Sequence, residues 1–287
     1  MIGAIEAGGT KFVCAVGEKA TDLRDRIVIP TRQPKETMAE VIAYFKKHEP
    51  LEAIGIASFG PIEVDKTSDY YGYITTTPKA GWENYDLLSP LKDAFPGTEL
   101  AFDTDVNGAA LGEYTHGAGQ DVRSVLYLTV GTGVGGGFVS DGEIRNGYGH
   151  PEMGHILVTR RSDDNYKSRC PYHSHCLEGL AAGPTVAGRL GKSSHEIDAS
   201  HPVFEAIADY LGQALVSYTV TLRPERIVIG GGLMKVPGLL DKVCQAFEKD
   251  LNGYLPIPKD YITSPALGDD AGITGAFLLG QEALLKE

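Results

Sequence analysis

The stretch from residue 131 to residue 178 concentrates residue types that can do chemistry. It opens with the glycine-rich segment GTGVGGG at 131–137, which follows an apolar run. Bare backbone amides in such a loop can bind a phosphate, because no Cβ blocks the approach. HPEMGH follows at 150–155 and CPYHSHCLE at 170–178. The combination predicts an enzyme that binds a phosphorylated nucleotide and a polar small substrate beside a structural metal.

Two thiols and two imidazoles in this stretch are ligand types that zinc prefers. We expect His155, Cys170, His173 and Cys176 to bind the ion, with His175 as a competing ligand. The alternative is a solvated, histidine-rich loop without metal. Four protein ligands fill a tetrahedron and leave no position for a catalytic water, so the pattern favours a structural zinc ion.

A second glycine turn lies near the N-terminus, in the segment EAGGTK at 6–11, between two apolar runs. This arrangement is strand, glycine turn, strand, whereas a Walker loop or a dinucleotide fingerprint would open a helix. An ordinary tight hairpin is the alternative. A third glycine turn, at 230–232, follows another apolar run and suits close contact with a base or ribose. The expected ATP and phosphate contacts are Gly8, Gly9, Thr10, Lys11, Thr132, Gly133, Gly231 and Gly232.

Asp105 stands between a short apolar run and a predicted helix at 106–114. Taken alone, it is explained as the N-cap of that helix. Beside two phosphate-binding hairpins, it is better explained as a general base that accepts a hydroxyl proton while the oxygen attacks a γ-phosphate. Asp103 and Asn107 could orient this carboxylate or the substrate.

Strands and helices are predicted to alternate along the chain, which is typical of an α/β fold. The predicted strands are 2–6, 12–16, 53–58, 100–102, 125–130, 137–140 and 226–229. The predicted helices are 34–47, 106–114, 203–222, 238–251 and 273–285. The repeated glycine hairpin suggests an ancient duplication with one nucleotide site between the halves. We expect a small α/β domain at 1–114, completed by a C-terminal helix within 273–287, and a larger α/β domain with the zinc-binding loop at 115–272.

The net charge of the 287-residue chain is −12. Such an acidic field repels phosphate backbones and anionic surfaces, so we expect neither a nucleic-acid partner nor a membrane partner. No signal peptide and no apolar run of membrane-spanning length are recognised, which predicts a cytoplasmic protein. In that setting, cysteines interleaved with histidines favour a metal over a disulfide.

Taken together, these motifs resemble the ROK family of sugar kinases and repressors, and within it the bacterial fructokinases. EAGGTK at 6–11 resembles the first phosphate motif, TDVNGAALGE at 104–113 resembles the segment of the catalytic base, and 131–155 resembles the family signature. The resemblance covers essentially the whole chain. It implies the two-domain actin-like ATPase fold, which is ribonuclease H-like, with lobes that close around ATP and sugar. It also implies a homodimer.

The resemblance assigns roles to particular residues. Asp105 would be the general base, Glu6 would help to position magnesium, and His155 would contact sugar while holding zinc through its other ring nitrogen. Segments 77–79 and 81–82 stand where typical glucokinases have an asparagine-containing sugar loop, which favours fructose as the substrate. The expected sugar-binding residues are Gly60, Pro61, Asp105, Glu152, His155 and Glu178.

The sequence therefore predicts an ATP-dependent fructokinase that makes fructose 6-phosphate, with magnesium and a structural zinc ion. Another hexose kinase of the family, acting on glucose, mannose or an N-acetyl sugar, is the nearest alternative. A sugar-responsive regulator is a second alternative, but such proteins carry an N-terminal helix-turn-helix, whereas this chain begins at the first phosphate strand. A non-catalytic sugar- or zinc-binding protein would need neither Asp105 nor two glycine hairpins.

Overall fold

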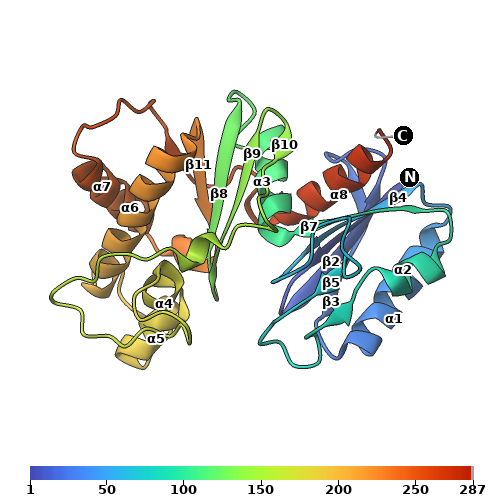
Figure 1. Cartoon of the computed structure of the whole chain (residues 1–287), viewed down its shortest axis with the longest axis horizontal. Coiled ribbons are helices and arrows are strands. Elements are labelled where there is room, and N and C mark those ends of the chain that lie inside the picture. Colours follow the sequence, from blue (N-terminus) through green and yellow to red (C-terminus); the bar gives the residue numbers. More distant parts are fainter. Residues whose placement is uncertain (286–287) are drawn as a thin grey trace.

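The computed structural model describes residues 1–285, and a five-stranded sheet organises its first lobe (Figure 1). The strands are β1 (Ile2–Ala7), β2 (Lys11–Gly17), β3 (Leu23–Pro30), β4 (Ala53–Ser58) and β7 (Glu99–Thr104). Their order is β3-β2-β1-β4-β7; β1 is antiparallel to β2 and parallel to β4. Helices α1 (Pro34–Phe45) and α2 (Ser89–Ala94) cover the outer face, where Ile5 packs in one core with Val41 and Phe45.

A second five-stranded sheet organises the other lobe. Its strands are β8 (Ser124–Val130), β9 (Val134–Ser140), β10 (Glu143–Ile144), β11 (Arg226–Gly230) and β12 (Ile262–Thr263). Their order is β10-β9-β8-β11-β12, and the pairings again change from antiparallel to parallel after the third strand. The α-helices between β10 and β12 are α4 (Leu177–Ala181), α5 (Pro184–Leu190), α6 (Val203–Leu222) and α7 (Leu239–Leu251). The same strand order thus occurs twice, which agrees with the duplication hypothesis.

Two helices lie between the sheets, and each packs against the sheet that it does not follow in sequence (Figure 1). Helix α3 (Asp105–His116) follows β7 but packs on β8 and β9, whereas α8 (Ala271–Ala283) follows β12 but packs on β1 and β4. The two helices approach closely at glycines. A Cβ on Gly275 would lie 1.7 Å from the Gly108 carbonyl oxygen, so α3 and α8 pack with their backbones almost in contact. The two lobes therefore share this central layer.

The remaining elements are short connections. They are β5 (Tyr73–Ile74), β6 (Tyr85–Asp86), and the 3₁₀ turns η1 (Lys46–His48), η2 (Met153–His155), η3 (Ser194–Glu196), η4 (Gly232–Lys235) and η5 (Gly268–Asp270). Among the described residues, no helix combines the length and the apolar character needed to cross a membrane. Residues 286 and 287, the end of the expected C-terminal segment, lie outside the described part, and the division near residue 114 stays a prediction.

Most predicted elements are present, but the predicted extent of the glycine loop was wrong, and the alternative explanation of Asp105 as a helix cap is excluded. The strand expected at 137–140 begins at Val134, so residues 135–137 are strand residues and do not belong to a loop. Thr104 is the N-cap of α3, since its hydroxyl accepts the Asn107 N–H at 3.1 Å. Asp105 is the first residue of the helix, and the explanation of Asp105 as its cap therefore fails.

Candidate active site

Three predicted site segments meet at one edge of the first sheet. Strands β1, β4 and β7 are parallel neighbours, so their carboxyl ends lie side by side. The Gly8–Lys11 turn follows β1, Gly60 and Pro61 follow β4, and Asp105 follows β7. The parallel order therefore brings together residues that are up to about a hundred positions apart in the chain.

The Asp105 carboxylate is half-buried and is not used to cap its helix. Its Oδ1 accepts the Val106 backbone N–H at 2.9 Å. Burial raises the pKa of Asp105 to about 6, the Val106 N–H opposes this rise, and the negative charge of Glu152 adds to it. Asp105 and Glu152 therefore lie within the range of each other's electrostatic field. A carboxylate with this pKa is ionised at neutral pH and can accept a proton.

Glu6 is a second carboxylate of this site. It shares a face of β1 with Ile2 and Ala4, the face covered by α8. A Cβ on Gly272, in the first turn of α8, would lie 2.6 Å from Glu6 Oε1. Burial and the nearby charge of Asp105 raise the pKa of Glu6 to about 7. The negative charge of each carboxylate makes a nearby cation more favourable.

Behind Asp105, a polar network joins the first lobe to the segment after β10. Asp103 Oδ1 accepts the Thr104 N–H and the Asn107 amide, both at 2.7 Å. The Asn107 amide also donates to Asn146 Oδ1 at 3.0 Å. Asp103 is buried, and burial raises its pKa against the effect of these donors. The sequence indicated Asp103 and Asn107 but gave no signal for Asn146.

The turn between β1 and β2 is tight and is held from β3. The Gly8 N–H donates to the Lys11 carbonyl at 2.9 Å, and the Thr31 hydroxyl donates to the Gly8 carbonyl at 2.7 Å. Nothing lies within 4 Å of the position that a Cβ on Gly9 would occupy. Thr10 and Lys11 are exposed. The turn is thus fixed in shape and open to a ligand at Gly9.

Two glycine turns lie together at the carboxyl ends of β8 and β11. A Cβ on Gly131 would be 3.9 Å from the Gly232 backbone nitrogen. Gly231 has a φ of +95°, and a Cβ there would be 2.5 Å from the Val130 backbone, so only glycine fits. Gly183, which the sequence analysis missed, donates its N–H to the Gly131 carbonyl at 2.8 Å. Thr132 is exposed beside them.

The other glycines of the 131–137 segment have a packing explanation. A Cβ on Gly136 would lie 2.5 Å from Met153 Sδ, and one on Gly137 would lie 2.4 Å from the Val106 carbonyl oxygen. These glycines let α3 and η2 approach β9 closely. The phosphate-type loop is therefore shorter than predicted and consists of 131–133.

Glu178 connects the glycine turn with the predicted zinc ligands. Its Oε2 accepts the Val134 N–H at 3.0 Å, and a Cβ on Gly133 would be 2.6 Å from this oxygen. Its Oε1 lies 3.9 Å from His155 Nε2. Glu178 and His155 are both half-buried, so each remains accessible from the solvent side.

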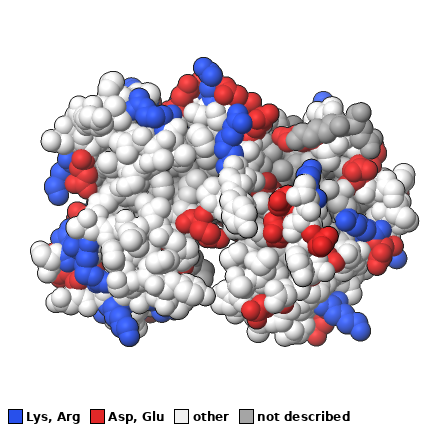
Figure 2. Space-filling model, viewed as in Figure 1, with Lys and Arg blue, Asp and Glu red and all other residues white. Residues whose placement is uncertain are grey.

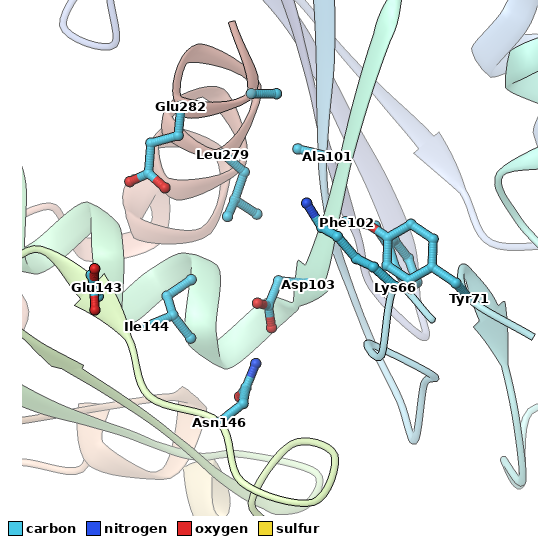
Figure 3. Close-up of a pocket in the computed structure, with 11 residues that line it drawn as sticks. Lys66, Tyr71, Ala101, Phe102, Asp103, Glu143, Ile144, Asn146, Leu279 and Glu282 are labelled. Carbon is cyan, nitrogen blue, oxygen red and sulfur yellow. The ribbon is translucent and has the colours of Figure 1, made fainter. Parts of the chain in front are cut away.

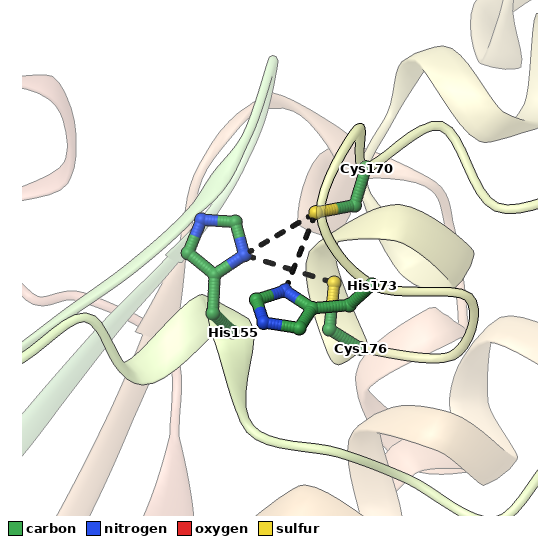
Figure 4. A group of neighbouring side chains, drawn as sticks. All are labelled: His155, Cys170, His173 and Cys176. Carbon is green, nitrogen blue, oxygen red and sulfur yellow. Dashed lines mark hydrogen bonds between the residues drawn. The ribbon is translucent and has the colours of Figure 1, made fainter. Parts of the chain in front are cut away.

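The four predicted zinc ligands form one group (Figure 4). Their nearest nitrogen and sulfur atoms all lie within 4.8 Å of one another. His155 Nδ1 is 3.8 Å from Cys170 Sγ and 3.7 Å from Cys176 Sγ, and Cys170 Sγ is 3.4 Å from His173 Nδ1. The expected competitor, His175, is half-buried and lies outside this group, and its Nδ1 contacts the Ser174 hydroxyl at 2.8 Å.

These residues fit a metal ion in number, type and spacing. Ligands about 2.0 to 2.3 Å from a tetrahedral zinc ion are separated by about 3.3 to 3.8 Å, close to the three distances above. Cys176 Sγ also accepts the Gly179 N–H at 3.4 Å, the kind of outer contact that orients a thiolate ligand. Burial raises the pKa of Cys176 to about 11. A bound divalent cation would reverse this effect.

A cavity of about 280 Å³ lies beside this site rather than in it (Figure 3). It opens between β7, the segment of β10 and the end of α8, and Asp103 and Asn146 line it together with Lys66 and Tyr71. The described lining residues include neither Asp105 nor Glu152. The cavity therefore contacts the polar network behind Asp105 and not the predicted base itself.

Trp82 belongs to the hydrophobic core. Trp82, in the segment expected to replace a sugar loop, is fully buried against Phe12, Phe59 and Tyr85, and its ring N–H donates to the Arg32 carbonyl at 2.8 Å. It is thus a core residue near the carboxyl end of β4.

Figure 2 shows Asp and Glu side chains on both sides of the boundary between the lobes, in keeping with the net charge of −12.

The repeated sheet order, the exchanged central helices and the glycine turns at the strand ends define an actin-like ATPase fold. A ROK hexokinase from Thermus thermophilus has the same fold, with a TM-score of 0.84 and 26% identity, over 100% of this chain and 99% of that one. The prediction of this fold is confirmed.

The model of the ROK family matches residues 2–283, and the chain belongs to this family. It is 49% identical to a fructokinase of Pediococcus pentosaceus, over 99% of each chain. It is 45% identical to a putative fructokinase of Bacillus subtilis strain 168, over 100% of this chain and 97% of that one.

Proposed function

We propose that this protein is an ATP-dependent fructokinase, which transfers the γ-phosphoryl group of ATP to fructose and forms fructose 6-phosphate. Two relatives with this name or a provisional form of it are 45% identical or more over nearly the whole chain. The observation that carries the proposal is Asp105, a half-buried carboxylate at the start of α3 that does not cap the helix.

In this proposal, Asp105 is the general base. Its pKa of about 6 keeps it largely ionised at neutral pH, and it is still basic enough to take the proton of a sugar hydroxyl as the oxygen attacks phosphorus. Phosphoryl transfer otherwise needs positioning and charge neutralisation. The glycine turns at the neighbouring strand ends would supply this positioning, so the reaction would need no reactive side chain besides the base.

The glycine turns would bind ATP. The turn at 8–11 and the turn at 131–133 would hold the phosphates through backbone N–H groups, and Gly231 and Gly232 would approach the ribose or base. Magnesium would enter with ATP and neutralise phosphate charge. Glu6 would hold this ion or its waters, which is consistent with a pKa raised to about 7 in the absence of a cation.

The sugar would bind between Asp105 and the metal-binding loop. We assign its contacts to Gly60 and Pro61 on the first lobe and to Glu152, His155 and Glu178 on the second. Zinc held by His155, Cys170, His173 and Cys176 would fix the direction of the His155 ring, because its Nδ1 faces the sulfur atoms and its Nε2 faces Glu178. The ion would have a structural role only.

The assay that tests this function measures ADP formation from ATP with each sugar in turn, coupled through pyruvate kinase and lactate dehydrogenase. ATP-dependent turnover with fructose, exceeding turnover with glucose, mannose and N-acetyl sugars, is the expected result. A higher kcat/KM with another hexose would identify the other family kinase. Saturable sugar binding without turnover of any hexose would favour the regulator or binding protein. The homodimer stays a prediction, which sedimentation velocity measurements would test.

A further inference from the structure

His150 is a buried side chain that the proposed catalytic roles leave unused. It lies in the segment between β10 and η2, and only 11% of its side chain is exposed. Its ring lies over the backbone of Gly60, since a Cβ on that residue would be 3.9 Å from the ring. A residue from the second half of the chain thus fills the space beside the first-lobe segment after β4.

Hydrogen bonding fixes the tautomer of this ring. The Ile62 backbone N–H donates to His150 Nε2 at 3.2 Å, so Nε2 has a free lone pair and carries no proton. The proton of the neutral ring is therefore on Nδ1. Nδ1 lies 3.5 Å from Glu152 Oε1, at the outer limit of a hydrogen-bond distance, so its proton lies near enough to attract this carboxylate.

The contact matters because of where Glu152 acts. Its side chain is 48% exposed and would be free to rotate without a partner. Burial is the main cause of the raised pKa of Asp105, and the charge of Glu152 contributes to it, so the two carboxylates lie within electrostatic range of each other. His150 connects the backbone of Ile62 with the half-exposed Glu152 carboxylate.

We propose that His150 is a positioning residue for the sugar site: held by the Ile62 N–H, it orients the Glu152 carboxylate toward the space that the sugar hydroxyls occupy beside Asp105. The inference rests on the proposed function. It assigns His150 neither to zinc nor to proton transfer. Because the same ring contacts Ile62 on the first lobe, the orientation of Glu152 depends on the lobes being in the arrangement described here.

The tautomer can be tested without turnover. In a long-range ¹H–¹⁵N spectrum of the ¹⁵N-labelled protein, one of the eight histidines should show a proton on Nδ1, and this signal should vanish in His150→Gln. A proton on Nε2 of His150 would overturn the proposal. This measurement does not depend on fructose as the substrate, so it separates an error here from an error in the proposed function.

Kinetics test the positioning role. Glutamine places its amide at the Nε2 end of the imidazole, so His150→Gln can keep the Ile62 bond while it loses the donor to Glu152. We expect its KM for fructose to rise about tenfold, as for the loss of one charge-assisted contact, and its KM for ATP and melting temperature to change little. A KM for fructose within about twofold of wild type, or an equal rise in the KM for ATP, would overturn the proposal.

Two companion variants sharpen the result. Tyr148→Ala is the matched control, because Tyr148 is fully exposed in the same segment; it should behave like wild type. The effects of His150→Gln and Glu152→Gln on the KM for fructose should not add in the double variant, since both act through one carboxylate. Additive effects would contradict the proposal. If wild type prefers another hexose, the same comparison is made with that hexose.

Discussion

Replacing Asp105 with Asn should slow phosphoryl transfer by about three orders of magnitude and, at neutral pH, stabilise the fold. In the wild type, Asp105 Oδ1 accepts the Val106 N–H at 2.9 Å. Asparagine keeps a side-chain oxygen that can accept this N–H, but it cannot take a proton from a hydroxyl. Loss of a general base lowers rates by about 10²- to 10⁴-fold. We therefore expect kcat to fall by about 10³-fold while ATP still binds, because we assign the phosphates to the backbone of the glycine turns and not to Asp105.

The stability effect follows from the pKa of the same group. Burial raises the pKa of Asp105 from 3.8 to about 6. One pKa unit corresponds to about 1.4 kcal/mol, so ionising this carboxyl in the folded protein costs up to about 3 kcal/mol relative to the unfolded chain. The cost is present in full above about pH 6 and disappears as the pH falls toward about 4, where both states are protonated. The Asn variant should therefore gain stability over wild type as the pH rises from about 4 to about 6, and should be clearly more stable above about pH 6.

Circular dichroism melting curves at about pH 7.5 and about pH 4.5, together with the coupled kinase assay, test both halves of this prediction. Asp93→Asn, an exposed position on α2, is the control and should change neither quantity. A kcat within about tenfold of wild type would remove Asp105 from the role of base. A lower melting temperature than wild type at the higher pH would show that its burial does not cost what we infer.

Three further predictions concern pH, metal and glycine. Because protonated Asp105 cannot act as a base, kcat should be half-maximal near pH 6 and fall about tenfold per pH unit below it; a flat pH–rate profile down to about pH 5 would contradict this. Elemental analysis should find zinc bound, and Cys176→Ser should release it and raise the KM for fructose more than the KM for ATP; a metal-free preparation of unchanged activity would exclude the zinc site. Gly9→Ala should raise the KM for ATP at an unchanged melting temperature, since its Cβ meets nothing within 4 Å. Gly137→Ala should instead destabilise the fold by about 1 to 3 kcal/mol, because its Cβ would lie 2.4 Å from a carbonyl oxygen. Thermal unfolding and ATP titration measure both, and a normal KM for ATP in the Gly9 variant would argue against phosphate binding at this turn.

Elements with a strong apolar period could be predicted from the sequence, and those without one could not. The predictions for β4 and α6 match residue for residue, since both bury long regular runs. Strand β3 was missed because most of its side chains are exposed and charged residues interrupt any alternation. Helices α4 and α5 have five and seven residues, too few for a helical period to emerge.

The candidate site was predictable where its residues are adjacent in sequence, and not where the fold brings them together. The zinc ligands share a short segment apart from His155, and their residue types identified them. Asn146 and His150 contact residues 39 and 88 positions away, so no local pattern could indicate their partners. Gly136 and Gly137 show the converse error. Sequence alone cannot distinguish a glycine that admits a ligand from one that admits a neighbouring helix.

The exchange of the two central helices also affects how the chain can fold as it is synthesised. The strands of the first sheet end at Thr104, but the helix that covers their inner face, α8, is translated more than 160 residues later. A Cβ on Gly55 would lie only 1.8 Å from the Ala276 carbonyl oxygen, so α8 packs directly on the backbone of β4. The first sheet must therefore wait until α8 has been translated, with an apolar surface that chaperones can recognise. A stop codon near residue 270 would leave that surface bare.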